Sequence, residues 1–541
     1  MIKHTCLAAL WVFYVNLLYG QMLQTNWTQN VGGYFNDFAA ELCVDYDGNL
    51  WGIGYVDGAV DNLAHHGQDD VFLFKMDAQG NLLWQTVFGS TYKDRGHSLA
   101  IDAHNNCWIS GYFNDTIVIE SDTLISSGYT DAFLIKFSPS GQLLWHTTLG
   151  SSGFEQGQQL AIRDHAVYWT GFFQGNHSIG GNSLIEATNI DLFLIKLDTS
   201  GNFIWSKQWG CPTVESILGI NIHSNGNIAV LSNFRDAVLI EGDTIWGYTT
   251  SNTLLTHFNP TGHLLWTYSI GGTGAHVIYD DIGNLYLAGS YQYSIEINGQ
   301  TIAPQEEFDA YLLALDHQGN YLWSNLLQGT DLIIATDLLW HSNRQELYVC
   351  GIYQGTIYYG NDSLARSSDG PRHIDDDIFL MVFDGQGTLL HSQRFGNNDS
   401  DWAAALTLDT ATEALYLLGS YNSGTTIGND TIYAMGGSDL FVAQFHINPV
   451  SIHNIETTPI AVKIAPNPTT QYLNIHLSSE QITAIQISIV NQQGQVVQFM
   501  NVDAPNPEIQ LELLPSLPQG MYWLCLKDSN NIQSVPFTLL K

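Results

Sequence analysis

Short hydrophobic runs of strand length recur along the chain, and none shows the 3.6-residue spacing of an amphipathic helix. In one recurring segment an apolar run ends at a Gly turn, and a second run containing Trp follows, as in DAFLIKFSPSGQLLW. Copies of this segment begin at Asp70, Asp131, Asp191, Asn252, Asp309 and Asp377, and a shortened copy begins at Asp439. Consecutive copies start 57 to 68 residues apart. The chain is therefore predicted to repeat one supersecondary unit seven times.

A second segment recurs with the same spacing, from GNLWGIGYV at Gly48 to EALYLLGSY at Glu413. Six of its seven copies carry a glycine in mid-strand, and the fourth copy has Ser232 instead: Gly54, Gly111, Gly171, Gly289, Gly351 and Gly419. A mid-strand glycine marks a bulge or a close backbone approach. With the hairpin through each Gly turn, every unit is predicted to form four short strands.

Both side-chain sets of a strand such as DAFLIKF are apolar, so the strand must be covered on both faces. Seven four-stranded sheets that bury both faces against their neighbours close into a propeller. The seventh unit breaks off after Phe445 without its Trp strand, whereas Trp27 precedes the first unit at the same spacing as the later tryptophans. We therefore expect residues 25–31 to complete the sheet built by residues 402–445.

The composition changes near residue 449, because nine of the fourteen prolines fall in the last 93 residues. This tail carries alternating strands such as YLNIHL and IQISIV, which predict a small antiparallel sandwich. At the other end Lys3 precedes an apolar run that is too short for a membrane span, as in a signal peptide. The prediction is an all-β chain: signal peptide 1–20, seven-bladed β-propeller 21–446, linker 447–461 and immunoglobulin-like β-sandwich 462–541.

The net charge of the chain argues against polyanionic partners. The chain has 52 acidic and 16 basic residues, a net charge of −36, which repels nucleic acid and anionic lipid head groups. No later stretch is long and apolar enough for a transmembrane segment. Five scattered cysteines remain beyond the signal peptide, without Cys-x-x-Cys spacing, so neither a disulfide framework nor a zinc site is expected.

Both parts resemble families known in exported bacterial proteins. The units are similar to the bacterial seven-bladed propeller repeat of surface proteins, with its Asp-aromatic-Leu strand, Gly turn and Trp. The tail resembles the C-terminal sorting domain of type IX secretion in Gram-negative bacteria, on the residues Pro466, Asn467, Pro468, Gly494, Gly520, Tyr522 and Lys541. The resemblance implies passage through the outer membrane by the type IX machinery, followed by display on the surface or release.

Motifs for catalysis are incomplete. Gly96-His97-Ser98 resembles the start of a nucleophile elbow, but no helix follows Ser98. The segment from Asp45 resembles a calcium loop, but Val56 stands where a bidentate Glu belongs, so an Asp-Gly turn is favoured. The Gly-x-x-x-Trp repeat is also similar to that of quinone-cofactor dehydrogenase propellers, which are eight-bladed and carry vicinal cysteines. No catalytic residue, metal or cofactor is predicted.

One long segment of the sixth unit does not repeat, and long loops on a rigid ring are where binding tends to reside. Its charged residues are the predicted ligand-binding site: Arg366, Arg372, His373, Asp375, Asp376 and Asp377. The leading hypothesis is a non-catalytic surface propeller that binds a protein or glycan partner, as in adhesion. The alternatives are an enzyme acting on polysaccharide, which paired carboxylates in a central pocket would favour, and a structural coat component.

Overall fold

The computed structural model describes residues 23–179, 182–184, 190–211, 216–305, 308–359, 362–366, 375–397, 399–448, 462–477, 484–490, 496–503, 508–515, 517–527 and 532–540. All regular elements in these ranges are β-strands, and the chain divides into two compact units after Asn448. The predicted signal peptide 1–20 and residues 449–461 of the predicted linker lie outside the described ranges.

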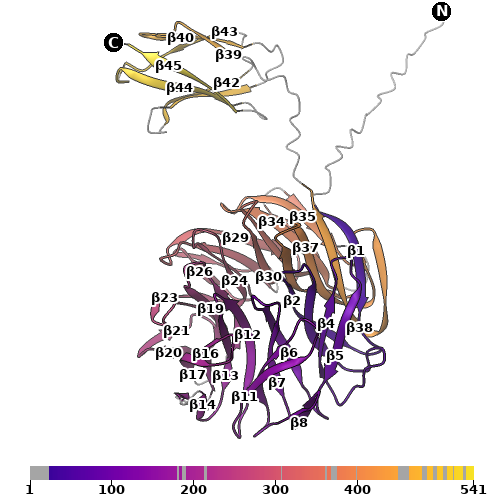
Figure 1. The fold of residues 1–541 in the computed structure, drawn as a ribbon. Helices are drawn as coiled ribbons and strands as arrows, with labels where there is room; N and C mark the ends of the chain where they lie inside the picture. Colours follow the sequence, from indigo (N-terminus) through magenta and orange to yellow (C-terminus); the bar gives the residue numbers. More distant parts are fainter. Residues whose placement is uncertain are drawn as a thin grey trace, which may run out of the picture. The chain divides into compact units, whose positions relative to one another are not determined.

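The first unit contains seven antiparallel sheets, and in each of them the four main strands lie in the order first, second, third and fourth (Figure 1). In two of the sheets a small hairpin adds two more strands beyond the fourth. The first strands are β2 (Asp37–Val44), β6 (Arg95–Ile101), β12 (Gln156–Arg163), β18 (Ser216–Ile222), β24 (Thr273–Tyr279), β30 (Ile333–His341) and β36 (Asp401–Asp409). The second strands are β3 (Leu50–Val56), β7 (Cys107–Phe113), β13 (Ala166–Phe173), β19 (Ile228–Phe234), β25 (Leu285–Tyr291), β31 (Glu346–Tyr353) and β37 (Ala414–Ile427).

The third strands begin at the leading residues of the recurring segment or one residue before, except in the seventh sheet: β4 (Asp70–Met76), β10 (Asp131–Phe137), β16 (Ile190–Asp198), β22 (Asn252–Phe258), β28 (Asp309–Leu315), β34 (Asp377–Asp384) and β38 (Asp430–Ile447). The fourth strands are β5 (Leu82–Phe88), β11 (Leu143–Leu149), β17 (Phe203–Cys211), β23 (Leu264–Gly271), β29 (Tyr321–Gly329), β35 (Leu389–Phe395) and β1 (Leu23–Val31). Five small hairpins occupy second-to-third connections: β8 (Thr116–Ile119) with β9 (Asp122–Ile125), β14 (His177–Ile179) with β15 (Asn182–Leu184), β20 (Ala237–Ile240) with β21 (Asp243–Trp246), β26 (Ile295–Ile297) with β27 (Gln300–Ile302), and β32 (Thr356–Tyr359) with β33 (Asp362–Ala365).

The sheets form a closed ring. Each first strand contacts the first strands of both neighbouring sheets, from β2 through β6, β12, β18, β24, β30 and β36 back to β2. An apolar cluster fills each of the seven spaces between consecutive sheets, including the space between the last sheet and the first. The all-β propeller fold predicted from strands that are apolar on both faces is therefore confirmed.

The first strand of the chain closes the ring. β1 pairs antiparallel with β38, in a register that runs from Leu23 opposite Ile447 to Val31 opposite Leu440. The start of the chain thus supplies the fourth strand that the seventh unit lacks, and this covers the edge of β38. The predicted completion of the last sheet by residues 25–31 is confirmed.

The mid-strand glycines meet a bulge in the neighbouring first strand. The register between first and second strands shifts in each of the seven sheets, for example between Ala39 and Glu41 opposite β3. A Cβ at Gly54 would lie 2.1 Å from the main-chain oxygen of Phe38, and one at Gly111 would lie 2.0 Å from that of Arg95. The predicted close backbone approach is confirmed at these positions.

The recurring Trp packs on the next sheet. Trp84 of β5 lies against Gly141, the turn glycine of the following sheet, where a Cβ would come within 2.1 Å of the indole ring. The same pairing joins Trp27 to Gly80, Trp145 to Gly201, Trp205 to Gly262, Trp266 to Gly319 and Trp323 to Gly387. All six glycines have φ between +81° and +87°, which L side chains rarely adopt. The Gly-x-x-x-Trp repeat therefore encodes contacts between sheets.

The second unit is a sandwich of two antiparallel sheets. One sheet contains β39 (Val462–Ala465), β40 (Tyr472–Leu477) and β43 (Glu508–Glu512). The other contains β41 (Ala484–Val490), β42 (Val496–Asp503), β44 (Gly520–Lys527) and β45 (Ile532–Leu539). Alternate residues of both sheets, such as Leu473, Ile489 and Leu524, form its core.

Candidate functional site

The two ends of the ring differ in the connections that they carry. Because strands within a sheet alternate in direction, all second-to-third connections and all connections between sheets lie at one end, here called the loop end. The short turns lie at the other, the hairpin end. Exposed aromatic side chains concentrate at the loop end: Tyr34, Phe35, Tyr92, Tyr129, Phe154, Trp246, Tyr248, Tyr293, Tyr358 and Tyr433. Among the described propeller residues, the hairpin end has one, Tyr46.

Two of these side chains form an exposed platform. The rings of Tyr129 and Phe154 stack with centroids 4.7 Å apart and an interplanar angle of 8°. They remain 65% and 44% exposed although they cover each other. Tyr129 precedes β10 and Phe154 precedes β12, so adjacent sheets hold the pair. A flat, exposed aromatic surface fits the apolar face of a sugar ring or an apolar side chain of a partner.

A second group of aromatic side chains spans three sheets near the starts of their first strands. Trp402 of β36 stacks on Phe38 of β2 at 6.4 Å, and Phe38 stacks on Tyr55 at 5.0 Å. The guanidinium of Arg95 lies 4.2 Å from the centroid of the Tyr55 ring. We call these four residues the aromatic row. All four are partly exposed, and the Arg95 guanidinium also forms an ion pair with Asp69 at 2.6 Å, so the row adds an ordered surface to the loop end.

Of the predicted ligand-binding residues, Asp376 contacts this row. Asp376 accepts hydrogen bonds from Nε1 of Trp402 at 3.0 Å and from Nε2 of Gln354 at 2.8 Å. Arg366 follows β33, and its main-chain N–H donates to the carbonyl of Gly355 at 2.9 Å. Asp375 is half-buried and Asp377 is buried at the start of β34. Arg372 and His373 lie outside the described residues.

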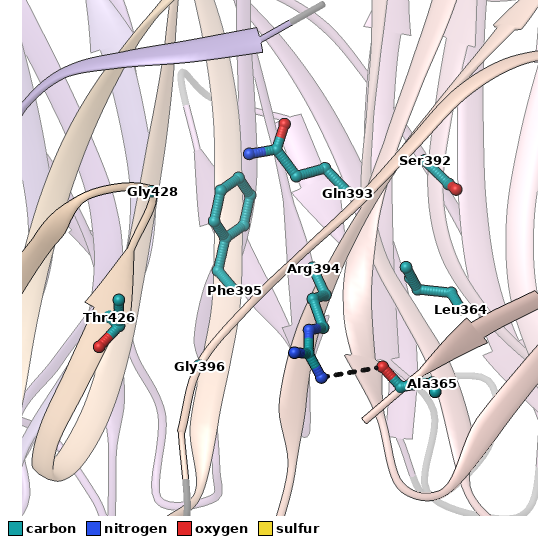
Figure 2. Close-up of a pocket in the computed structure, with 9 residues that line it drawn as sticks. All are labelled: Leu364, Ala365, Ser392, Gln393, Arg394, Phe395, Gly396, Thr426 and Gly428. Atoms are coloured by element: carbon teal, nitrogen blue, oxygen red, sulfur yellow. Dashed lines mark hydrogen bonds between the residues drawn. The ribbon is translucent and has the colours of Figure 1, made fainter. Parts of the chain in front are cut away.

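A pocket of about 490 Å³ opens next to Arg366, between the sixth and seventh sheets (Figure 2). Its walls come from β33, from β35 and from the hairpin of β37 with β38. Figure 2 shows Arg394 reaching toward β33, where its Nη1 donates a hydrogen bond to the carbonyl oxygen of Ala365 at 3.1 Å. Gly396 and Thr426 form the opposite wall. The pocket offers one guanidinium and several main-chain groups to a small polar group of a partner.

Asp377 forms one of several carboxylate pairs between sheets. A Cβ at Gly396 would lie 2.6 Å from Oδ1 of Asp377 and 2.7 Å from Oδ2 of Asp401, so the two carboxyl groups are no farther apart than the sum of these distances. Both residues are buried. Burial raises the pKa of Asp401 to about 8, and the charges of Asp377 and Asp399 add to the effect. At neutral pH this pair holds a proton.

The Asp401 carboxyl makes stability depend on pH. Since its pKa is higher in the folded than in the unfolded chain, its stabilising contribution is complete below about pH 4 and is lost as the pH rises through about 8. Raising the pH from 6 to 9 is expected to lower the Tm of the natural chain more than that of Asp401→Asn, by a few degrees. Thermal unfolding at both pH values measures this difference, and equal shifts in both proteins would contradict it.

A charged cluster lies where first strands face the centre. Glu41, His276 and Asp337 each follow the bulge of their own first strand, in the first, fifth and sixth sheets. Nδ1 of His276 forms an ion pair with Oδ1 of Asp337 at 2.6 Å. Although burial alone would lower it, Asp337 raises the pKa of His276 to about 9. Burial and then the charge of Asp337 raise the pKa of Glu41 to about 8. At neutral pH the cluster therefore holds a protonated carboxyl beside an imidazolium–carboxylate pair.

Two segments with incomplete motifs have structural roles. Ser98 lies inside β6, fully buried, and its Oγ accepts a hydrogen bond from the main-chain N–H of Leu160 at 3.1 Å. Oδ1 of Asp45 accepts main-chain N–H groups of Asp47 and Asn49 at 3.0 and 2.8 Å, as in an Asp-Gly turn. Among the described residues no three His, Cys, Asp or Glu side chains gather as metal ligands, and no helix is long and apolar enough to span a membrane.

The residues of the predicted sorting motif are spread over the second unit. Pro466, Asn467 and Pro468 are exposed between β39 and β40, and Oδ1 of Asn467 accepts the main-chain N–H of Thr538 at 3.0 Å. Gly520 begins β44, and Tyr522 is buried against Phe537. Gly494 and Lys541 lie outside the described residues.

Residues 463–537 match the family described as secretion system C-terminal sorting domain. The resemblance of the tail is thus confirmed, and the chain carries a type IX sorting domain. Such a domain indicates secretion through the outer membrane to the cell surface or the extracellular space.

Two curated proteins are similar to this chain at low sequence identity. The uncharacterized WD repeat-containing protein L264 of Acanthamoeba polyphaga mimivirus is 22% identical over 447 residues, 67% of this chain and 32% of that protein. The regulatory protein FlaEY of Caulobacter vibrioides is 22% identical over 300 residues, 49% of this chain and 31% of that protein. The chain spans about a third of the length of these relatives.

Solved structures resemble the chain weakly. A protein of unknown function from Bacteroides caccae has a TM-score of 0.33 and 14% identity, and covers 63% of this chain and 93% of its own. A subtype N10 neuraminidase-like protein of A/little yellow-shouldered bat/Guatemala/060/2010 has a TM-score of 0.34 and 8% identity, and covers 79% of this chain and 100% of its own. TM-scores this low support no functional inference.

Proposed function

We propose that the protein is a non-catalytic, exported β-propeller that binds a protein or glycan partner at its loop end. The observation that carries this proposal is the concentration of exposed aromatic side chains at that end, against one among the described residues of the hairpin end. Aromatic side chains give large contact areas at low entropic cost, and they are enriched at binding surfaces. The sorting domain brings this surface to the cell exterior, where such partners are found.

The partner must tolerate the charge of the chain. A net charge of −36 repels polyanions, which favours a neutral glycan or a basic protein surface. Arg366 and Arg394 add local positive charge at or next to the pocket. The aromatic row and the pocket then provide the contacts that distinguish one partner from another.

Substitution of the Tyr129–Phe154 platform tests this function. The double variant Tyr129→Ala/Phe154→Ala is expected to weaken binding at least tenfold, because it removes two exposed stacked rings. Tyr46→Ala is the matched control, since Tyr46 is 75% exposed at the hairpin end. Affinity electrophoresis against neutral polysaccharides, and cross-linking to basic surface proteins, identify the partner. A partner bound equally by the platform variant would contradict the proposal.

The second candidate function is hydrolysis or elimination on a polysaccharide at the centre of the ring. Glu41 and Asp337 favour it, since they are carboxyl groups from different sheets and burial raises the pKa of Glu41 to about 8. A protonated Glu41 has the state of a general acid at neutral pH. Turnover faster than about 1 per second that Glu41→Gln abolishes would replace the binding function by this one.

A further inference from the structure

Each carboxylate pair between sheets combines residues from two positions of the repeat. One member is the leading Asp of a third strand, such as Asp70 or Asp439. The other begins or precedes the next first strand, five residues after a glycine: Asp37, Asp94, Glu155 and Asp401. A Cβ at Gly32 would lie 2.7 Å from Oδ2 of Asp37 and 3.3 Å from Cγ of Asp439, which places these two carboxyl groups against the same glycine. This pair lies where the last sheet meets the first.

Three other junctions compensate the negative charge with protein groups, and the pair of Asp377 with Asp401 holds a proton. At the pair of Asp131 with Glu155, Nε2 of His177 lies 3.3 Å from Oε1 of Glu155. Asp70 has Nδ1 of His66 at 3.4 Å. In the fourth sheet the leading residue is Asn252, whose Oδ1 accepts a main-chain N–H of Tyr248 at 2.8 Å and whose Nδ2 donates to the carbonyl of Thr249 at 2.7 Å. Both polar atoms of the neutral Asn252 side chain therefore have hydrogen-bond partners.

The pair of Asp37 and Asp439 has no such compensation among the described residues. Both side chains are fully buried. Their Oδ2 atoms accept hydrogen bonds from the main-chain N–H groups of Gly33 at 2.5 Å and Met435 at 2.7 Å. Oδ1 of Asp37 and Oδ1 of Asp439 are buried without any hydrogen-bond partner, and neither residue is in an ion pair.

A third acceptor atom adds to the pair. Asn30 donates from Nδ2 to Oδ2 of Asp439 at 2.9 Å, and its Oδ1 is likewise buried without a partner. The junction therefore holds three oxygen atoms that accept hydrogen bonds and have no donor. Buried acceptors of this kind are costly unless a donor or a cation satisfies them.

We propose that Asp37 and Asp439 bind one Ca²⁺ at the junction that closes the ring. Carboxylate and amide oxygens are ligands for a hard cation, and Ca²⁺ tolerates the irregular geometry of two carboxylates completed by main-chain, amide or water oxygens. Asp37 begins β2 and Asp439 lies on β38, which pairs with β1, so the ion would link the first sheet to the strands that close the ring. An affinity of about 10⁻⁴ to 10⁻³ M suits an extracellular calcium site.

Calcium titration of the full chain tests the site. After chelation, measurements are made at pH 8, above the pKa of about 7 that burial gives Asp37. Isothermal titration with CaCl₂ is expected to show one ion per chain, and 5 mM Ca²⁺ is expected to raise the Tm of the propeller by about 2 °C. Absence of both effects in the natural chain would overturn the proposal and leave a shared proton as the explanation of the pair.

Two variants locate the ion. Asp439→Asn places at this junction the residue that the chain already uses at position 252, and it is expected to abolish both calcium effects. Asp37→Asn provides the same test from the other ligand if the first variant does not fold. Asp131→Asn is the matched control, because His177 compensates that junction, and it is expected to keep the calcium response. A response that survives both Asp37→Asn and Asp439→Asn would overturn the assignment.

Discussion

Removal of β1 is expected to destabilise the propeller more than any other change considered. A chain that begins at residue 33 loses the eight residue pairings between β1 and β38 together with the buried side chains of Leu23 and Val31. It also exposes the edge of β38 and frees Gly80 from its contact with Trp27. The expected cost is roughly 5 to 10 kcal/mol of unfolding free energy, measured by thermal or chemical unfolding.

The matched comparison is a chain that begins at residue 21 and carries Gln24→Ala. Gln24 is exposed on the same strand, so this variant is expected to stay within about 0.5 kcal/mol of the natural chain. If the chain that begins at residue 33 melted at the same temperature as this control, β1 would not close the ring.

The second large effect is expected at a turn glycine. Gly141→Ala combines the cost of a side chain at φ +84° with a clash between its Cβ and the Trp84 ring. The backbone cost is about 1 kcal/mol, and overpacking against the indole adds about 2 kcal/mol. We therefore expect the unfolding free energy of the propeller to fall by about 3 kcal/mol, as measured by chemical unfolding.

The chain contains a control for the backbone part of this cost. Gly242 has φ +96°, but nothing lies within 4 Å of the position of its Cβ. Gly242→Ala is expected to cost about 1 kcal/mol, the backbone cost alone. Equal losses at Gly141 and Gly242 would show that the contact between Trp and glycine does not hold neighbouring sheets together.

The repeat made most of the fold predictable from the sequence. Strands that are apolar on both faces need neighbours on both sides, and the missing Trp strand of the seventh unit pointed to Trp27. The structure also explains an exception in the repeat, His391, which occupies the Trp position of the sixth unit. The seventh sheet takes its fourth strand from the start of the chain, so it has no turn glycine between its third and fourth strands for a Trp to contact.

The candidate sites were less predictable because they combine residues from different units. Glu41, His276 and Asp337 occupy one repeated position whose other occupants are uncharged, namely Ser98, Gln159, Gly219 and Ala405, and no local motif marks them. The charged segment of the sixth unit was recognised because it does not repeat, but the sequence could not show that Asp376 binds the Trp402 side chain or that Asp377 faces Asp401.

One repeated signal in the sequence could have revealed the carboxylate pairs. Glycine followed five residues later by Asp or Glu precedes the first strand in several units, as in Gly32 to Asp37 and Gly396 to Asp401. The third-strand Asp repeats with it. Two acidic positions with the same period, each next to the start of a strand, predict a meeting at the junctions where both are present.

Amide hydrogen exchange tests the closed ring most directly. Residues 25–31 of β1 and residues 440–445 of β38 are paired in the structure, so the paired amides of both segments are expected to exchange slowly, and the β1 peptide is expected to exchange as slowly as the outermost strands of the other sheets. Exchange of the β1 peptide within seconds, beside a protected β38, would contradict a ring closed by the first strand of the chain.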